Sequence, residues 1–262
     1  MPNYFAGIDV GAVTTKCVII DDRKAILGFF VKNSGIDLKE AAENCYQKAI
    51  ETAKLSIENI KYVVGTGYGR ESISFANSTK TEISCHAKGS YFYFPRAITV
   101  IDIGGQDTKV IKVDEKGRIA GFKMNRKCAA GTGAFLEEIA GKMKVPVSSL
   151  DELARKATSN IELSSYCTVF ASTEILSKIR AGNTKEDMIR GAFNSVIKRV
   201  LEMDPLTGFV VMTGGVVAYN KIIVELIEGS KGIRINLPPN PQITGAFGAA
   251  LFAVEEYSIC RR

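Results

Sequence analysis

The chain has 262 residues, of which 46% are hydrophobic and 24% are charged, proportions that are ordinary for a globular protein of one large or two small domains. Its formal net charge of +6 is spread along the chain without aromatic interleaving or a basic tail, so we expect no nucleic-acid partner. No run of about 18 apolar residues occurs, and the start, MPNYFAGIDV, lacks a basic region followed by an apolar stretch. We therefore expect a cytoplasmic protein with no membrane partner.

The first predicted element is a β-hairpin with a small polar turn, GIDVGAVTTKCVIID, from Gly7 to Asp21. An apolar strand ends in Asp-x-Gly, and a second strand, which contains Cys17, follows the turn. The next segment, LKEAAENCYQKAI, has the spacing of an amphipathic helix and places Cys45 on its apolar face. Both cysteines are therefore predicted to be small core residues.

Two weaker patterns come next along the chain. GTGYGRE, from Gly65 to Glu71, lacks the spacing of a dinucleotide-binding loop and indicates a tight turn at a domain boundary. Cys85 stands beside His86, the only histidine, and the sequence assigns no role to this pair. The six cysteines are widely spaced and include no CxxC, which excludes a zinc knuckle or a thioredoxin-like site.

The hairpin then recurs as VIDIGGQDTKVIKVD, from Val100 to Asp114. Glycine in such a turn lets backbone N–H groups approach an anion, and threonine hydroxyls add further donors. An aspartate at the strand end can hold a hydrated Mg²⁺ beside phosphate oxygens. The repeat therefore predicts two phosphate-binding turns, while two ordinary hairpins are the alternative. The residues that recur in register are Ile8, Asp9, Gly11, Thr15, Lys16 and Asp21 in the first copy, and Ile101, Asp102, Gly104, Thr108, Lys109 and Asp114 in the second.

Two further cysteines, Cys128 and Cys167, each precede a run with helical apolar spacing. The dipole at a helix N-terminus favours the thiolate form of a cysteine. Two thiolates per chain are half of a four-thiolate iron–sulfur site, and a symmetric dimer would complete such a site. Two buried structural cysteines are the alternative.

The C-terminal part contains a strand that runs into a diglycine, VVMTGGVVAYN, and then a helix of small residues, NPQITGAFGAALFAVEEY. A diglycine at a strand end can admit the flat face of an adenine or a ribose, here at Gly214 and Gly215. Small residues along the last helix, such as Gly245 and Gly248, predict close packing against a neighbouring element.

The order of these motifs resembles the actin, sugar-kinase and heat-shock-chaperone ATPase superfamily over nearly the whole chain. The resemblance implies an α/β fold of two ribonuclease-H-like domains with a nucleotide cleft between them that closes over Mg-ATP. The first domain would span residues 1–97 and be completed by a C-terminal helix at 245–262. The second would span 98–244 and carry the cluster cysteines.

The same resemblance implies the site residues. Asp9 and Asp102 would organise the Mg²⁺ ion and the water. The resemblance does not say which side chain orients the hydrolytic water, and our own choice is Gln106. The residues implied in binding ATP lie in the turns and at helix starts, and they are Gly11, Ala12, Val13, Thr14, Thr15, Lys16, Gly104, Gly105, Gln106, Thr108, Gly131, Thr132, Gly133, Gly214, Gly215 and Gln242.

Within the superfamily, the chain closely resembles the activators (component A) of 2-hydroxyacyl-CoA dehydratases and related benzoyl-CoA reductase subunits. The motifs that carry this resemblance are GIDVGAVTTK, GTGYGR, DIGGQDTK, NRKCAAGTGAFLE, YCTVFASTE, TGGV and PQITGAFGAAL. It implies a homodimer with one [4Fe-4S] cluster held by Cys128 and Cys167 of each subunit. ATP hydrolysis would reorient the helices at the cluster, so that a low-potential electron from a ferredoxin or flavodoxin passes to a separate dehydratase or reductase.

Three other functions remain open at this point. A small-molecule kinase of the same fold, for example for an acyl group or an amino sugar, would use Asp102 or Asp107 as its base. A nucleotide-dependent scaffold would bind ATP without iron. An activator of a double-cubane-cluster reductase would share every motif named above.

Overall fold

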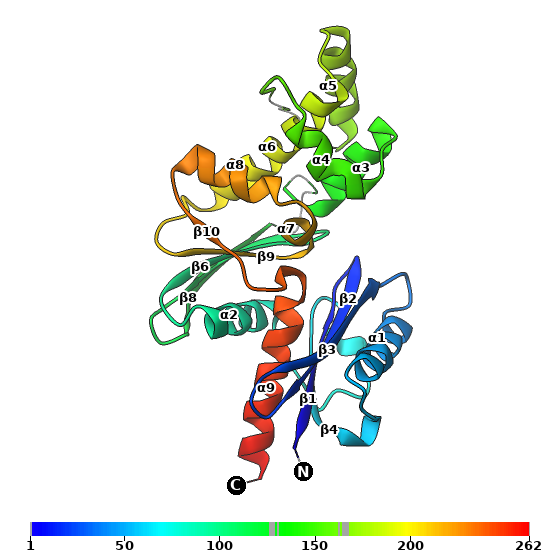
Figure 1. The fold of residues 1–262 in the computed structure, drawn as a ribbon, viewed down its shortest axis with the longest axis vertical. Helices are drawn as coiled ribbons and strands as arrows, with labels where there is room; N and C mark the ends of the chain where they lie inside the picture. The colour runs from blue at the N-terminus through cyan, green and yellow to red at the C-terminus, as the bar shows by residue number, and fades with distance from the viewer. Residues whose placement is uncertain (1, 126–128, 130, 162, 164–167, 262) are drawn as a thin grey trace. The chain divides into compact units, whose positions relative to one another are not determined.

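The computed structural model of the chain describes residues 2–125, 129, 131–161, 163 and 168–261. The predicted α/β class is confirmed, because two five-stranded sheets are each covered by helices (Figure 1). The chain divides into two compact units that are described separately below. Unit 1 comprises Met1–Ala97, Val113–Ala120 and Ile243–Arg262, and unit 2 comprises Ile98–Lys112 and Gly121–Gln242.

The sheet of unit 1 has the strand order β3-β2-β1-β4-β5. The central strand β1 pairs antiparallel with β2 and parallel with β4, so a hairpin edge and a parallel edge meet at β1. The hairpin that the sequence predicts is thus present, with residues 11–13 as its turn. The strands are β1 (Tyr4–Val10), β2 (Thr14–Asp21), β3 (Ile26–Asn33), β4 (Ile60–Thr66) and β5 (Ser78–Thr79).

Helices cover both faces of this sheet because β1 and β2 are apolar on both sides. Helix α1 (Leu38–Thr52) packs on the face that carries Ile8 and Ile19, and Cys45 of α1 is fully buried there, as the sequence predicts. Helix α9 (Thr244–Cys260) packs on the opposite face with Phe5 and Val18, beside α2 (Glu82–Tyr93). Helix α9 approaches β1 closely, since a Cβ on Gly7 would lie 2.0 Å from the carbonyl oxygen of Ala246.

Helix α9 is apolar, and much of it is buried in the core of unit 1. Pro241–Cys260 is the one helical segment in the described part of the chain that is long and apolar enough to cross a membrane. Yet 56% of its most apolar window is buried inside the protein, and residues such as Phe247 and Ala250 belong to the core of unit 1. The small residues of α9 therefore pack closely against β1 and α2, as the sequence predicts.

The sheet of unit 2 has the strand order β10-β9-β6-β7-β8. Here β6 and β7 form the second predicted hairpin, with residues 104–107 as the turn, and β9 pairs parallel with β6 on its other side. The neighbours of β6 therefore repeat those of β1, one from a hairpin and one parallel. The strands are β6 (Ile98–Ile103), β7 (Thr108–Val113), β8 (Ile119–Asn125), β9 (Val210–Thr213) and β10 (Ile235–Asn236).

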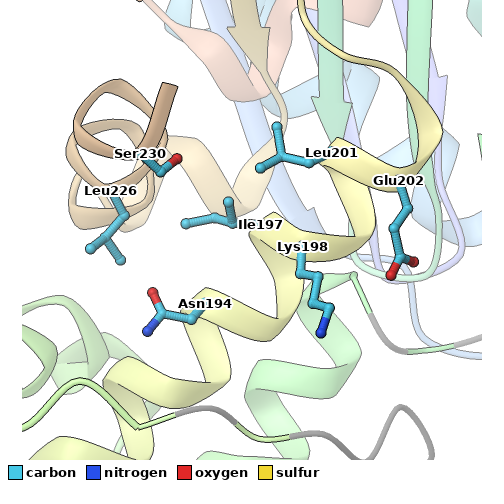
Figure 2. Close-up of a pocket in the computed structure, with 7 residues that line it drawn as sticks. All are labelled: Asn194, Ile197, Lys198, Leu201, Glu202, Leu226 and Ser230. Carbon is cyan, nitrogen blue, oxygen red and sulfur yellow. The ribbon is translucent and has the colours of Figure 1, made fainter. Parts of the chain in front are cut away.

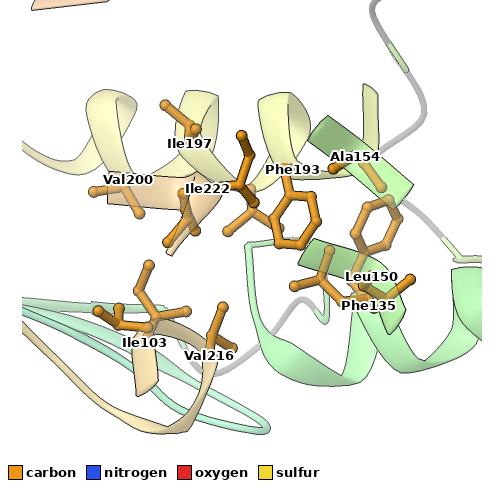
Figure 3. Packing of buried hydrophobic residues seen from close by; sticks show 14 of the residues in the cluster. Ile103, Phe135, Leu150, Ala154, Phe193, Ile197, Val200, Val216 and Ile222 are labelled. Atoms are coloured by element: carbon orange, nitrogen blue, oxygen red, sulfur yellow. The ribbon is translucent and has the colours of Figure 1, made fainter. Parts of the chain in front are cut away.

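One apolar core joins this sheet to the helices of unit 2 (Figure 3). Phe135 and Phe193 are fully buried at its centre, between α3, α6 and the strand residues Ile101 and Ile103. The core fixes the helices that follow the second turn and the diglycine relative to β6. The helices are α3 (Gly133–Met143), α4 (Leu150–Arg155), α5 (Thr168–Arg180), α6 (Lys185–Met203), α7 (Gly215–Tyr219) and α8 (Ile222–Lys231).

Candidate functional site

Each hairpin carries a buried aspartate that is paired with a lysine on the facing strand. Asp9 of β1 lies directly opposite Lys16 of β2, and the Lys16 Nζ is 3.2 Å from the Asp9 Oδ2. In the second copy the Lys109 Nζ is also 3.2 Å from the Asp102 Oδ2. The two aspartates are 6% and 3% exposed, respectively. The sequence repeat is thus also a repeat of side-chain geometry.

The turns are closed in the same way in both copies. The N–H of Gly11 donates to the carbonyl oxygen of Thr14 at 3.1 Å, and the N–H of Gly104 donates to that of Asp107 at 2.9 Å. A Cβ on Gly11 would approach the Thr14 carbonyl oxygen to 2.8 Å, so the first turn needs a glycine at this position. Both turns therefore present tight backbone loops next to a carboxylate.

The two threonines that recur in the repeat hold neighbouring segments in place. The Thr15 hydroxyl is hydrogen-bonded at 2.9 Å to that of Ser34, which in turn donates to the carbonyl oxygen of Gly11. The Thr108 hydroxyl donates to the carbonyl oxygen of Gly131 at 2.5 Å. Both hydroxyls are buried and engaged within the protein, so the structure places these two threonines as supports of the turns.

A second pair of equivalent glycines follows the parallel strands, and sequence reasoning missed one of them. Gly67 follows β4 with φ +96°, and Gly214 follows β9 with φ +100°. A Cβ on Gly67 would lie 2.6 Å from the Asp9 Oδ1, and one on Gly214 would lie 2.8 Å from the Asp102 Oδ1. The signal was present in the sequence, because VVGTG at Val63 matches VVMTG at Val210.

The second turn is hydrogen-bonded to the start of α3. The N–H of Gly133 donates to the carbonyl oxygen of Gly104 at 2.9 Å, and the N–H of Ala134 donates to that of Gly105 at 2.7 Å. These two amides would otherwise be without a helical partner, because the first N–H groups of a helix have none. The structure therefore brings the predicted residues Gly104, Gly105 and Gly133 together in one bonded unit.

The segment just before α3 is equally constrained. Gly131 has φ +90°, and a Cβ there would lie 2.9 Å from the Cβ of Arg199. Thr132 is fully buried, and its hydroxyl donates to the carbonyl oxygen of Ala129 at 2.6 Å. These predicted residues thus shape the loop that leads into α3.

Gln242, a predicted site residue, lies beside the diglycine. A Cβ on Gly215 would be 3.5 Å from the Gln242 Nε2, and the Gly214 N–H donates to the carbonyl oxygen of Pro241 at 3.0 Å. The Tyr219 hydroxyl donates to the Gln242 Oε1 at 3.0 Å, and the tyrosine ring is well exposed. Tyr219 is a further site candidate that the sequence alone did not single out.

His86 and Cys85 lie in the interior of unit 1 near Asp9. A Cβ on Gly245 would be 2.7 Å from the His86 Nε2 and 3.3 Å from the Asp9 Oδ2, so both groups border this glycine. Burial raises the pKa of the Cys85 thiol to about 12. Cys85 is therefore a buried thiol in the core of unit 1.

The other described cysteines fit the same picture. Burial raises the pKa values of Cys17 and Cys45, the latter to about 12, whereas Cys260 is exposed. Among the described residues no group of three or more His, Cys, Asp or Glu side chains is arranged to hold a metal ion. The predicted cluster ligands Cys128 and Cys167 lie outside the described residues.

The remaining predicted residues line the tips of the two turns. Ala12, Val13 and Thr14 are half-buried in the first turn, and Gln106 is exposed in the second. A groove of about 390 Å³ between α6 and α8 lies elsewhere in unit 2 (Figure 2). Its lining, which includes Asn194 and Leu226, contains none of the predicted site residues.

Known proteins are similar in sequence to this chain over nearly its full length. A model of the BadF/BadG/BcrA/BcrD ATPase family matches residues 6–253. The activator of lactoyl-CoA dehydratase from Anaerotignum propionicum is 44% identical over 255 residues, which cover 96% of this chain and 98% of that relative.

Solved structures agree with the fold. Component A of (R)-2-hydroxyglutaryl-CoA dehydratase from Acidaminococcus fermentans has a TM-score of 0.92 at 40% identity, covering 98% of this chain and 99% of its own. The activator of 2-hydroxyisocaproyl-CoA dehydratase from Clostridium difficile, solved with bound ADPNP, has a TM-score of 0.90 at 38% identity, covering 98% and 97%. A ROK family glucokinase from Streptomyces griseus has a TM-score of 0.61 at 12% identity, and the match covers 97% of this chain and 100% of that one. This likeness extends to the fold alone. These likenesses confirm the predicted actin-like ATPase fold.

Proposed function

Since the chain belongs to the BadF/BadG/BcrA/BcrD ATPase family, we propose that it is an ATP-hydrolysing activator that delivers low-potential electrons to a 2-hydroxyacyl-CoA dehydratase or a related reductase. The resemblance to the activators that the sequence motifs predict is confirmed by the relatives described above. Their names give the class of partner, and the two turns give the chemistry by which this chain would use ATP.

Backbone features of unit 2 support a nucleotide site at the end of β9. Gly214 has φ +100°, and a Cβ there would lie 2.3 Å from the carbonyl oxygen of Ile103, so the backbone at this strand end stays free of a side chain. We assign the adenosine to Gly214, Gly215 and Gln242, and the phosphates to the turn at Gly104 and Gly105. The residues of the first turn, Gly11 to Lys16, supply the same type of phosphate contact in unit 1.

The carboxylates of Asp9 and Asp102 suit Mg²⁺, which takes one or two carboxylate ligands together with substrate phosphates. Mg²⁺ bound there would neutralise charge on the phosphates during hydrolysis. Gln106 lies exposed at the tip of the second turn, where its amide can orient water. Thr15 and Thr108 keep the turns in shape through their buried hydroxyls.

The observation that carries the proposal is the pair of hydrogen bonds from α3 to the second turn. Gly133 and Ala134 of α3 donate to the carbonyl oxygens of Gly104 and Gly105. A change in the turn on binding or losing a phosphate is therefore passed directly to α3. This helix follows Cys128 in the sequence, and α5 begins at Thr168, the residue after Cys167. A nucleotide at the second turn would thus act directly on α3, the helix that follows Cys128, and through the contact between α3 and α5 on the helix that follows Cys167.

Thiol chemistry suits Cys128 and Cys167 for iron, whereas the described cysteines Cys17, Cys45 and Cys85 are fully buried core residues of unit 1. Two such residues per chain supply a [4Fe-4S] cluster with four thiolates when two chains form a symmetric dimer. The cluster, when bound, supplies one-electron transfer. A ferredoxin or flavodoxin in the cytoplasm would be the donor.

Iron analysis tests this proposal. Full-length protein is purified without oxygen, and iron and acid-labile sulfide are measured for wild type, Cys128→Ala, Cys167→Ala and Cys260→Ser. We expect about four iron and four sulfide per dimer in wild type and in Cys260→Ser, and none in the other two variants. Binding of ADPNP should remain in all four proteins, because the nucleotide residues are untouched.

Three results would contradict the proposal. Full iron in Cys128→Ala would remove the thiolate assignment. Wild-type protein without iron that still hydrolyses ATP would leave a kinase or a nucleotide-dependent scaffold as the function. A wild-type protein that fails to bind ADPNP would remove the ATPase assignment itself.

A further inference from the structure

Lys109 is a lysine in an unusual environment. The residue is 2% exposed on β7, although lysine is almost never fully buried unless it is paired. Its Nζ is 2.5 Å from the Asp107 Oδ1 and 3.2 Å from the Asp102 Oδ2, so the ammonium lies against two carboxylates. A buried charge of this kind is strongly held, because removal of one partner leaves the others uncompensated.

The first hairpin shows what is special about the second. Lys16 faces one carboxylate, that of Asp9, and its side chain is 14% exposed. The position equivalent to Asp107 is Thr14, which carries no charge. The first turn thus pairs one carboxylate with one ammonium, whereas the second holds two carboxylates around one buried ammonium.

We propose that the Lys109 ammonium is a built-in cation of the second turn, which occupies Asp102 and Asp107 and prevents a divalent metal ion from binding there until a nucleotide supplies phosphate ligands. The inference rests on the proposed function, because it concerns the turn to which we assign the phosphates. It goes further by giving Lys109 and Asp107 a role in setting the order of binding.

The charge balance explains this order. With Lys109 in place, the two carboxylates carry one net negative charge, and a divalent ion entering alone would meet the ammonium at close range. Mg²⁺ also dehydrates reluctantly and usually takes several of its ligands from substrate phosphates and water. The phosphates of an arriving nucleotide add both the negative charge and the oxygen ligands. The metal ion therefore enters together with the nucleotide.

Replacement of Lys109 by methionine removes this cation without creating a large void, because methionine is long, flexible and apolar. Asp102 and Asp107 then form a two-carboxylate site without the Lys109 ammonium. Such a site should recruit a divalent ion directly from solution. Lys16→Met is the matched control, because it removes the equivalent lysine beside a single carboxylate.

The experiment is a Mn²⁺ titration of full-length, nucleotide-free protein, with free Mn²⁺ followed by its room-temperature electron paramagnetic resonance signal. The proteins are wild type, Lys109→Met, Lys109→Arg, Lys16→Met and the double variant Lys109→Met/Asp107→Asn. We expect Lys109→Met to bind about one Mn²⁺ per chain, at least about tenfold more tightly than the other four proteins. Circular dichroism shows which variants are folded.

A folded Lys109→Met that binds Mn²⁺ no better than wild type overturns the inference. So does wild-type protein that takes up one Mn²⁺ per chain without nucleotide, a result that needs no variant to fold. The same wild-type sample is then titrated in the presence of ADPNP. Failure to bind Mn²⁺ there would count against the proposed nucleotide site, whereas the nucleotide-free titrations decide the role of Lys109.

Discussion

At the scale of single residues, the surroundings of a glycine decide how much its substitution matters. Gly214 and Gly208 both have positive φ angles, of +100° and +78°. A Cβ on Gly214 would lie 2.3 Å from the carbonyl oxygen of Ile103, whereas a Cβ on Gly208 would have nothing within 4 Å. Both positions need a positive φ, but only Gly214 would also meet a steric clash, so the comparison shows how much that clash adds.

We expect Gly208→Ala to lower the free energy of unfolding by about 1 kcal/mol, the strain of a left-handed backbone at an L-residue. Gly214→Ala should lower it by more than about 2 kcal/mol, because the strand end at Asp102 must also move. Equilibrium urea unfolding measures both. Equal losses would show that Gly214 is required only for its φ angle.

At the scale of elements, α3 is attached at its N-terminus to the second turn. A Cβ on Gly133 would lie 3.2 Å from the Gly105 Cα and 3.3 Å from the Gly104 oxygen, whereas one on Gly141 in the same helix would meet nothing within 4 Å. The start of the helix is therefore fitted to the turn, and its later part is free to change. This helix offers its own control.

We expect Gly133→Ala to push α3 away from the turn and to speed amide hydrogen exchange at residue 134 by about tenfold, or about 1.4 kcal/mol of local opening. Gly141→Ala should leave this exchange unchanged and stabilise the protein by about 0.5–1 kcal/mol, as alanine does in helices. Site-resolved hydrogen exchange measures the first effect and urea unfolding the second. Unchanged exchange in Gly133→Ala would mean that the turn absorbs the methyl group.

Much of this architecture could be predicted from the sequence, because Asp-x-Gly hairpins and a diglycine strand end are local patterns. What escaped prediction are contacts between distant segments. The Ser34 hydroxyl is hydrogen-bonded to Thr15 beside the first turn, and His86 packs against Gly245. The residues of each pair are far apart in the sequence. The hydroxyls of Thr15 and Thr108 bond to Ser34 and to the carbonyl oxygen of Gly131, respectively. The sequence repeat does not reveal these tertiary partners.

At the scale of the whole molecule, the two units share one arrangement built around a central strand. In both, the strand carries the aspartate, pairs with a hairpin strand on one side and runs parallel to a strand ending in Thr-Gly on the other. The second copy departs from the first at Asp107 and in its attachment to α3. The unit with the extra carboxylate is also the unit whose sequence contains Cys128 and Cys167.

A shared cluster should hold two whole chains together. We expect wild-type protein purified without oxygen to sediment as a dimer, and Cys128→Ala to dissociate at least about tenfold more readily, a difference of about 1.4 kcal/mol. Cys260→Ser is the control, because this exposed residue lies in the last turn of α9. Sedimentation velocity over a range of concentrations measures the change. Identical dimerisation of all three proteins would place the contact between chains away from the cluster.

The packing of α9 on Gly7 has a consequence for synthesis on the ribosome. The first strand of unit 1 meets the helix at Ala246 and Ala250 only after the whole of unit 2 has been translated. Unit 2 is continuous from Gly121 to Gln242 and can begin to collapse earlier. The apolar face of β1 that α9 covers must wait for this late, long-range contact, so it stays exposed to solvent and to chaperones through most of translation.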